Sequence, residues 1–317
     1  MAVSKIAFFT EMGFSGKVPR DHSNARTEFA WMIALDADHY PIASLPQVPH
    51  VYDLGIIILP KTNIESLSTV DIPSEMRRTC KNIAVMQEGP HTYFQDYPLA
   101  HQIWYYNTLM EMDILYCHNL SDVDYYHGLT NKPCRRLQSL MIEDTIGERK
   151  KQQHSTIIGG NMCSWYGGFD SYTVASELDF PIESPSMGRM ADGEDQLDNL
   201  THLPYMNWNE WVDNLSKYKY AIHLMRTHAA GTFALNCAYW GIPCIGYYGL
   251  DTQMTCHPLT TCQLGDLSHA SEIIKRLKKD YGFYKEQSEF CRMRYEENFS
   301  ESVFKDRWNE DNPEFQI

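Results

Sequence analysis

Residues 225–246 combine a loop of small residues with a predicted helix start, a pattern suited to binding phosphate. They follow an apolar run at 220–224 and read MRTHAAGTFALNCAYWGIPCIG. The small residues of the loop let a ligand approach the backbone, and the helix predicted over 232–239 begins with amide groups that have no helical acceptor. These amides and the helix dipole would suit a diphosphate, to which Arg226 is expected to add a charge-assisted hydrogen bond.

The elements before this segment alternate between buried strands and amphipathic helices. In the first half, a helix is expected to begin at Ser23 or Asn24 and to carry its apolar face over 26–35. Continuous apolar runs are typical of parallel strands covered on both faces. Such runs occur at 5–10, 54–59, 82–86 and 113–117.

The pattern begins again after a polar stretch at 143–154. A second strand is predicted at 155–160, followed by a glycine-containing loop and a helix over 170–178. We therefore predict an α/β fold with two Rossmann-like domains, at 1–150 and 151–290. Ligands are expected at the carboxyl ends of both sets of strands, which face each other across a cleft.

Composition limits the class of protein. The chain has 317 residues, of which 43% are hydrophobic, so it can form two cores. No segment reaches the roughly 20 apolar residues of a membrane span, and the start lacks a signal-peptide core, so a cytoplasmic protein is expected.

The nine cysteines form no CxxC motif. A net charge of −14 disfavours coating of nucleic acid, and basic clusters such as 149–151 are interpreted by default as solvated loops.

The segment at 225–246 resembles the donor-binding signature of retaining GT-B glycosyltransferases, particularly the family 4 type. That family has an E-G-F-G loop followed by a helix with L-E-A-x-A-x-G-x-P-V-I, and this chain has HAAG at 228–231 followed by LNCAYWGIPCI at 235–245. The resemblance implies the GT-B fold, with a C-terminal helix over 291–317 packing back on the first domain. It also implies sugar transfer from a nucleoside-diphosphate sugar, with a UDP-sugar expected.

Several donor residues differ from the family pattern. His228 replaces the glutamate that contacts the sugar, and Asn236 replaces the one that binds the ribose. The usual Arg and Lys after the first strand of the second domain are absent, so Arg226 or Arg189 is expected to replace them. The implied donor-binding residues are Arg226, Thr227, His228, Ala229, Ala230, Gly231, Thr232, Asn236, Arg189 and Gly160.

Sugar transfer passes through an oxocarbenium-like state while the nucleoside diphosphate departs, and a base can take the acceptor proton. The candidate bases are His91, Glu88 and Glu11, in loops of the first domain. A locally hydrogen-bonded loop histidine is the competing interpretation of His91. His223 is expected to be a core histidine, whereas the loop position of His228 favours function.

In GT-B enzymes the loop equivalent to 11–26 approaches the acceptor. Glycines and cations here suit a phosphate-bearing acceptor, and the residues concerned are Gly13, Gly16, Lys17 and Arg20. One candidate acceptor is DNA with a hydroxymethylated pyrimidine, because the compact size and variant signature resemble tailed-phage glycosyltransferases, although the acidity of the chain counts against DNA. The alternatives are a carbohydrate or lipid-linked saccharide, and a non-catalytic sugar-nucleotide-binding protein, which the loss of both glutamates favours.

Two Asp-x-Asp pairs, at 36–38 and 122–124, have the spacing of metal-binding pairs in the other major glycosyltransferase fold. Neither pair ends an apolar strand, and Ser121 with Asp124 suits a helix cap. We therefore predict no metal site and no cofactor, with the sugar nucleotide as a substrate.

Overall fold

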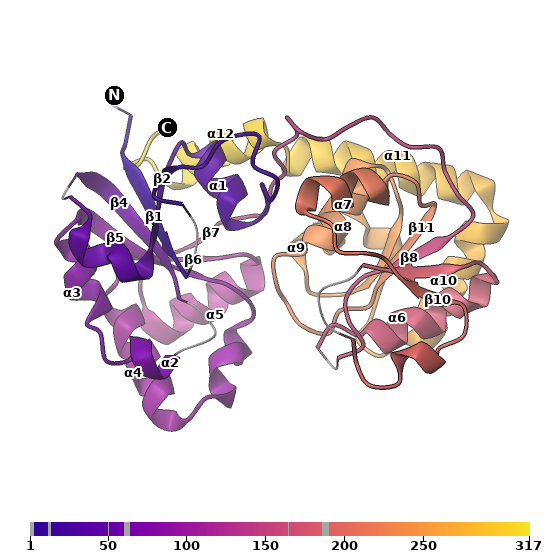
Figure 1. The fold of residues 1–317 in the computed structure, drawn as a ribbon, viewed down its shortest axis with the longest axis horizontal. Coiled ribbons are helices and arrows are strands. Elements are labelled where there is room, and N and C mark those ends of the chain that lie inside the picture. The colour runs from indigo at the N-terminus through magenta and orange to yellow at the C-terminus, as the bar shows by residue number, and fades with distance from the viewer. Residues whose placement is uncertain (1–2, 12–13, 50, 60–63, 164, 186–189) are drawn as a thin grey trace. The chain divides into compact units, whose positions relative to one another are not determined.

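The computed structural model describes residues 3–11, 14–49, 51–59, 64–163, 165–185 and 190–317, without the side chains of residues 91 and 93. The chain divides into two compact units, each with its own sheet and flanking helices (Figure 1). Unit 1 comprises Met1–His22, Thr27–Ile142 and Glu301–Ile317. Unit 2 comprises Ser23–Arg26 and Glu143–Ser300.

Over the described residues, the sheet of unit 1 has seven strands in the order β2-β3-β1-β4-β5-β6-β7. Neighbours are parallel except β2 and β3. The strand β1 is buried along its whole length, as its continuous apolar sequence predicts for a sheet covered on both faces. The strands are β1 (Ile6–Thr10), β2 (Gly16–Lys17), β3 (Asp38–Pro41), β4 (Tyr52–Ile58), β5 (Cys80–Gln87), β6 (Ile114–Cys117) and β7 (Cys134–Arg136).

The helices of unit 1 bury apolar residues against this sheet, around a core that includes Phe9, Ile57 and Leu115. Most of them lie between consecutive strands along the chain, and one comes from the C-terminal segment Glu301–Ile317. They are α1 (Glu28–Ala34), η1 (Ile42–Gln47), α2 (Ile64–Leu67), α3 (Ile72–Arg77), η2 (His91–Asp96), α4 (Leu99–Glu111), α5 (Leu120–Thr130) and α12 (Glu301–Asp311).

Two helix starts in unit 1 differ from those predicted. The cap of α1 is Thr27 rather than Ser23 or Asn24, which belong to unit 2, where the Asn24 Oδ1 accepts a hydrogen bond from the Trp208 amide at 3.0 Å. The cap of α5 is Asn119, so Ser121 lies inside the helix and does not cap it. In both cases the helix begins at a different residue from the polar one that the sequence predicted as its cap.

Over the described residues, the sheet of unit 2 has six parallel strands in the order β10-β9-β8-β11-β12-β13. Its core includes Ile158, Ile222 and Ile245 from three adjacent strands. The strands are β8 (Thr156–Ile158), β9 (Ile182–Ser184), β10 (Leu200–His202), β11 (Tyr220–His223), β12 (Cys244–Tyr247) and β13 (Thr261–Cys262).

The helices of unit 2 include the one predicted after the small-residue loop, α8, whose bounds agree with the sequence prediction. The helix predicted over 170–178 begins two residues earlier and ends as a 3₁₀ turn. The helices are α6 (Gly168–Ala175), η3 (Ser176–Leu178), η4 (Glu194–Gln196), α7 (Trp208–Leu215), α8 (Thr232–Tyr239), α9 (Asp251–Cys256), η5 (Pro258–Thr260), α10 (Leu267–Lys279) and α11 (Tyr281–Asn298).

The C-terminal segment is shared between the units. Helix α11 belongs to unit 2, and the chain that belongs to unit 1 starts at Glu301, later than the expected 291. Within unit 1, the Trp308 ring stacks on Tyr116 with centroids 5.8 Å apart, and the Tyr116 hydroxyl donates to the Asn312 side chain at 2.6 Å. None of the helices in the described part of the chain has the length and apolar character needed to cross a bilayer.

Candidate functional site

The turn between β11 and α8 begins where the central strand of unit 2 ends. Gly231 precedes α8 with φ 67°, a left-handed conformation that favours glycine. A Cβ at this position would lie 2.0 Å from the Thr252 Oγ1, and that hydroxyl donates to the Gly231 carbonyl oxygen at 3.0 Å. The turn is therefore fixed against α9, and a side chain at 231 would displace it.

The turn is accessible to a ligand. Arg226 is exposed and residues 227–230 are half-buried, whereas Met225 and Gly231, at the two ends of the turn, are buried. The first amides of α8 have no acceptor within the helix, so they direct partial positive charge toward the turn. Half-buried small residues before such amides leave room for a ligand, and this arrangement is suited to binding an anion.

Arg226 is held by an ion pair within unit 2. Its Nη2 and Nε donate to the Asp170 Oδ2 at 2.7 and 3.1 Å, and the Tyr247 hydroxyl donates to the same oxygen at 3.1 Å. The Asp170 side chain is 10% exposed, against 48% for Arg226. The hydrogen bond to Asp170 raises the pKa of Arg226. The nearly buried Asp170 carboxylate thus holds the Arg226 guanidinium at the edge of the turn.

The loop after β8 lies beside the turn. Gly160 has φ 80° and its carbonyl oxygen accepts from the Ser184 hydroxyl at 3.4 Å. A Cβ at Gly167 would lie 1.9 Å from the Leu224 carbonyl oxygen, so this loop packs directly on the end of β11. The Arg226 amide donates to the Trp165 carbonyl oxygen at 3.1 Å. Two predicted donor elements, near Gly160 and at 226–231, therefore meet at one edge of the sheet.

Two histidines flank these loops. The His228 ring lies against Gly249, where an added Cβ would be 2.0 Å from its Nε2. His223, the last residue of β11, contacts the Phe233 ring at 4.9 Å between centroids, and burial lowers its pKa to about 4. Its Nε2 has no hydrogen-bond partner among the described residues. His223 was expected to be a satisfied core histidine, but its ring instead leaves one buried nitrogen without a hydrogen-bond partner among the described residues, beside Gly159.

The remaining predicted donor residues are Thr232, Asn236 and Arg189, of which the first two differ in how accessible they are to a ligand. Thr232 is the first residue of α8 and is half-buried. Asn236 lies one turn further along α8 with 2% exposure, so its side chain is enclosed by unit 2. Arg189 lies outside the described residues.

The candidate bases belong to unit 1. Glu11 follows β1 and is exposed, whereas Glu88 follows β5 and is half-buried. Because β1 and β5 belong to one parallel set, both carboxylates lie at the carboxyl edge of that sheet. His91 begins η2 at the same edge, and its side chain lies outside the described part of the structure.

The cations proposed to meet the acceptor have carboxylate partners within unit 1. The Lys17 Nζ lies 3.1 Å from the Asp36 Oδ1 and 3.5 Å from the Asp38 Oδ1. Arg20 forms two hydrogen bonds to Glu301, at 2.7 and 3.0 Å, which lower the pKa of that carboxylate. Gly16 precedes Lys17 in β2 with φ 101°, and Gly13 lies outside the described residues.

These contacts also give the first Asp-x-Asp pair a structural role. Both of its carboxylates interact with Lys17, and in the second pair the Asp122 Oδ2 accepts a hydrogen bond from the Asn119 Nδ2 at 3.3 Å. Over the described residues, no group of three or more His, Cys, Asp or Glu side chains is arranged to hold a metal ion.

Comparison with models of protein families and with curated proteins finds no match. Solved structures with similar folds include sucrose-phosphate synthase from Thermosynechococcus elongatus, with a TM-score of 0.71 at 10% identity over 98% of this chain and 99% of that one. Anabaena HepE, solved with UDP and glucose, gives 0.71 at 8% identity over 98% and 100%.

A third similar structure is an alpha-glucosyltransferase in complex with UDP and a DNA 13-mer containing an HMU base. It gives a TM-score of 0.65 at 13% identity, over 98% of this chain and 100% of that one. Because such agreement extends over the whole length of each chain, this protein has the GT-B fold of two parallel-sheet α/β domains.

Proposed function

We propose that this protein is a glycosyltransferase that takes a sugar from a UDP-sugar bound by unit 2. The observation that supports this most strongly is the accessible turn at 225–231, fixed by Gly231 against Thr252 at the start of α8. The similar structures add weight, because HepE and the alpha-glucosyltransferase were both solved with UDP.

In the proposed reaction, the bond between the anomeric carbon and the β-phosphate oxygen breaks, and UDP leaves with the electron pair. The acceptor oxygen forms the new bond to carbon and loses its proton, to Glu88, Glu11 or His91. The amides of α8 and the Arg226 guanidinium stabilise the negative charge that develops on the leaving diphosphate. Positioned amides need no reorganisation during the reaction, so this stabilisation is available in the transition state.

The decisive experiment measures UDP release from a panel of UDP-sugars, with and without added acceptors. A glycosyltransferase releases UDP with at least one donor, and acceptor increases the rate. A non-catalytic binding protein binds the donor in calorimetry but releases no UDP under any condition. Binding of no sugar nucleotide at all would contradict both functions.

For the acceptor, we propose DNA that contains a hydroxymethylated pyrimidine. The alpha-glucosyltransferase solved with DNA supports this choice, because it matches over its whole length. Radiolabel from the UDP-sugar is then expected in DNA with hydroxymethylated bases and not in unmodified DNA of the same sequence.

A carbohydrate acceptor is the second candidate, and the ion pairs of Lys17 and Arg20 favour it. Both cations are already neutralised by carboxylates of unit 1, so their interaction with a phosphate backbone requires exchange of partners. Competition between modified DNA and free saccharides in one assay separates the candidates. Label transfer to a saccharide, with none to modified DNA, would contradict the DNA proposal.

A further inference from the structure

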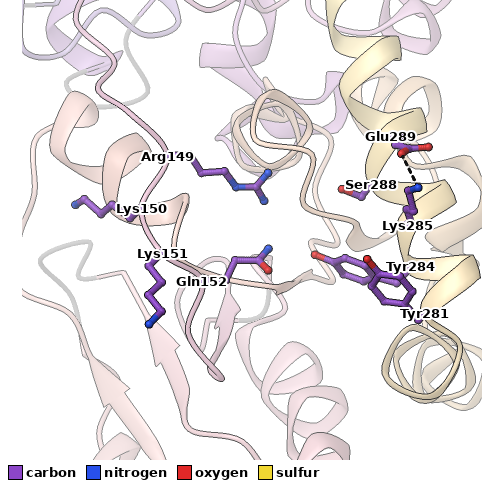
Figure 2. A pocket seen from close by; sticks show the side chains of 9 residues that line it. All are labelled: Arg149, Lys150, Lys151, Gln152, Tyr281, Tyr284, Lys285, Ser288 and Glu289. Carbon is purple, nitrogen blue, oxygen red and sulfur yellow. Dashed lines mark ion pairs between the residues drawn. The ribbon is translucent and has the colours of Figure 1, made fainter.

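A second concave site lies in unit 2, at the opposite edge of its sheet from the turn at 225–231. This pocket has a volume of about 690 Å³ and is lined by residues 149–152 and by the first turns of α11 (Figure 2). Residues 149–152 lead into β8, whereas the turn follows β11, and the two strands are parallel. The segment before one strand and the segment after the other therefore lie at opposite edges.

The segment at 149–152 is fixed to unit 2 by its backbone. The Lys150 amide donates to the Ser216 hydroxyl at 3.0 Å, and the Gln153 amide donates to the Lys217 carbonyl oxygen at 2.8 Å. On the other side of the pocket, the Ser288 hydroxyl donates to the Gly241 carbonyl oxygen at 2.5 Å. Both walls are therefore built into unit 2.

The pocket is cationic in a chain that is otherwise acidic. Arg149, Lys150, Lys151 and Lys285 line it, and the only lining carboxylate is Glu289, 3.7 Å from the Lys285 Nζ. Within the described part of the chain, the side chains at 149–151 form no ion pair. Lys285 is thus partly compensated by Glu289, whereas no described carboxylate compensates the cations at 149–151, and cations without a carboxylate partner at a pocket favour an anionic ligand.

Two tyrosines give the pocket an aromatic wall. Tyr281 is 72% exposed, whereas Tyr284 is 7% exposed, with the Lys219 Nζ 4.8 Å from its ring centroid. Burial raises the pKa of the Tyr284 hydroxyl to about 12, against the opposing effects of Gln152 and Arg149. Figure 2 shows Arg149 and Gln152 extending toward α11. Cations beside an exposed ring are the combination that binds a phosphate joined to a nucleobase.

We propose that this pocket is a second binding site for a nucleotide unit, whose phosphate contacts Arg149 and Lys285 and whose base stacks on Tyr281. The volume suits a ligand of that size. This site does not depend on the proposed donor site, because the two occupy opposite edges of the sheet. The nucleotide is either free in solution or part of a single strand, and the two sources share the chemistry that the pocket recognises.

The test is calorimetric titration of the full chain with UDP and, separately, with a short oligothymidylate. Wild-type protein is expected to bind one of these ligands at the pocket, with an affinity that falls at higher salt. Arg149→Gln combined with Lys285→Gln should weaken that binding by at least about tenfold, because two charge-assisted contacts to the phosphate are lost. Tyr281→Ala should weaken it as well, and Arg149→Lys should retain most of it.

The matched control is Lys275→Gln combined with Arg294→Gln, which removes the same charge from unit 2 outside the pocket. These two side chains pair with Glu177 and Glu297. UDP at both sites gives two binding events, of which the pocket variant removes one. If the donor proposal fails, the pocket variant removes all UDP binding. Identical binding of both ligands by wild type and the pocket variant would overturn the second site.

Discussion

The carboxylate of Asp170 determines how Arg226 can act. It is nearly buried, and it accepts hydrogen bonds from both Arg226 and Tyr247. Sequence reasoning identified the cation but not its partner, which lies 56 residues away in α6. Any test of Arg226 must therefore separate loss of ligand contact from exposure of an unpaired carboxylate.

Arg226→Ala is expected to weaken UDP binding by about tenfold to a hundredfold, because it removes a charge-assisted contact. It should also lower the free energy of unfolding by about 1 kcal/mol, since Asp170 loses a partner. Adding Asp170→Asn should restore stability but not binding. Calorimetry and urea unfolding measure the two effects, and unchanged UDP affinity in both variants would remove Arg226 from the site.

The buried side chain of His257 is expected to make the stability of the protein depend on pH. Its Nε2 lies 2.9 Å from the Ala234 carbonyl oxygen, and its Nδ1 accepts from the Cys244 amide at 3.3 Å, so both nitrogens are satisfied in the neutral ring. Burial lowers its pKa to about 4, from the ordinary value near 6.5. Between these values the unfolded chain binds more protons than the folded one, so stability falls as pH falls.

We expect urea unfolding at pH 5 to show a free energy about 2 kcal/mol lower than at pH 7 through His257 alone. His223 adds a change of the same sign, because burial also lowers its pKa to about 4. His257→Gln should reduce the difference between the two pH values while leaving the contribution of His223. An equal pH dependence in wild type and variant would contradict this account.

At the scale of elements, the start of α8 is set by its contact with α9. Gly231 needs both a left-handed backbone and the absence of a Cβ, since Thr252 occupies the space. The sequence predicted the glycine turn from composition and spacing. Only the fold shows which neighbour enforces it.

Gly231→Ala is therefore expected to cost about 1–3 kcal/mol of stability and to abolish UDP binding at the turn. Gly265→Ala is the matched control, because Gly265 has φ 81° but no atom within 4 Å of an added Cβ. The control should lose about 1 kcal/mol and retain UDP binding. Both variants are compared by thermal unfolding and calorimetry, and equal UDP affinities would show that the turn does not hold the diphosphate.

Helix α12 is attached to unit 1 by a buried polar contact. The Asn312 Oδ1 accepts from the Tyr116 hydroxyl at 2.6 Å and from the Arg135 Nη1 at 2.8 Å, and Asn312 is 1% exposed. Asn312→Ala leaves the Tyr116 hydroxyl buried without this acceptor, which should cost about 1–3 kcal/mol. Hydrogen exchange in β6 and α12 should increase, whereas Glu310→Ala, at an exposed position, should leave it unchanged. Unaltered exchange in Asn312→Ala would show that another contact attaches the helix.

At the scale of the whole molecule, the net charge of −14 affects the choice of acceptor. An acidic chain binds DNA only through local cations, and those predicted near the acceptor are paired with carboxylates. If DNA is the acceptor, its KM should increase steeply with salt, because counterion release governs phosphate contacts. The KM for a neutral saccharide should change little. Steady-state assays over a range of salt concentrations provide the measurement.

We also predict that chelators leave activity unchanged. Amides of α8 and Arg226 are proposed to stabilise the leaving diphosphate, which makes a divalent cation unnecessary. UDP release is measured with EDTA and again after adding Mg²⁺ or Mn²⁺. A rate that collapses with EDTA and returns with either ion would contradict this mechanism.

The sequence by itself determined the fold class, the restart of the strand–helix pattern, and the helix Thr232–Tyr239 with its glycine turn. These features depend on hydrophobic periodicity and on backbone preferences, which are set by residues that are close together in the sequence. It did not determine that Asp170 holds Arg226, that carboxylates neutralise Lys17 and Arg20, or that residues 149–152 and α11 form a cationic pocket. Those pairings join residues far apart in the chain, and only tertiary packing brings their charges within a few ångströms.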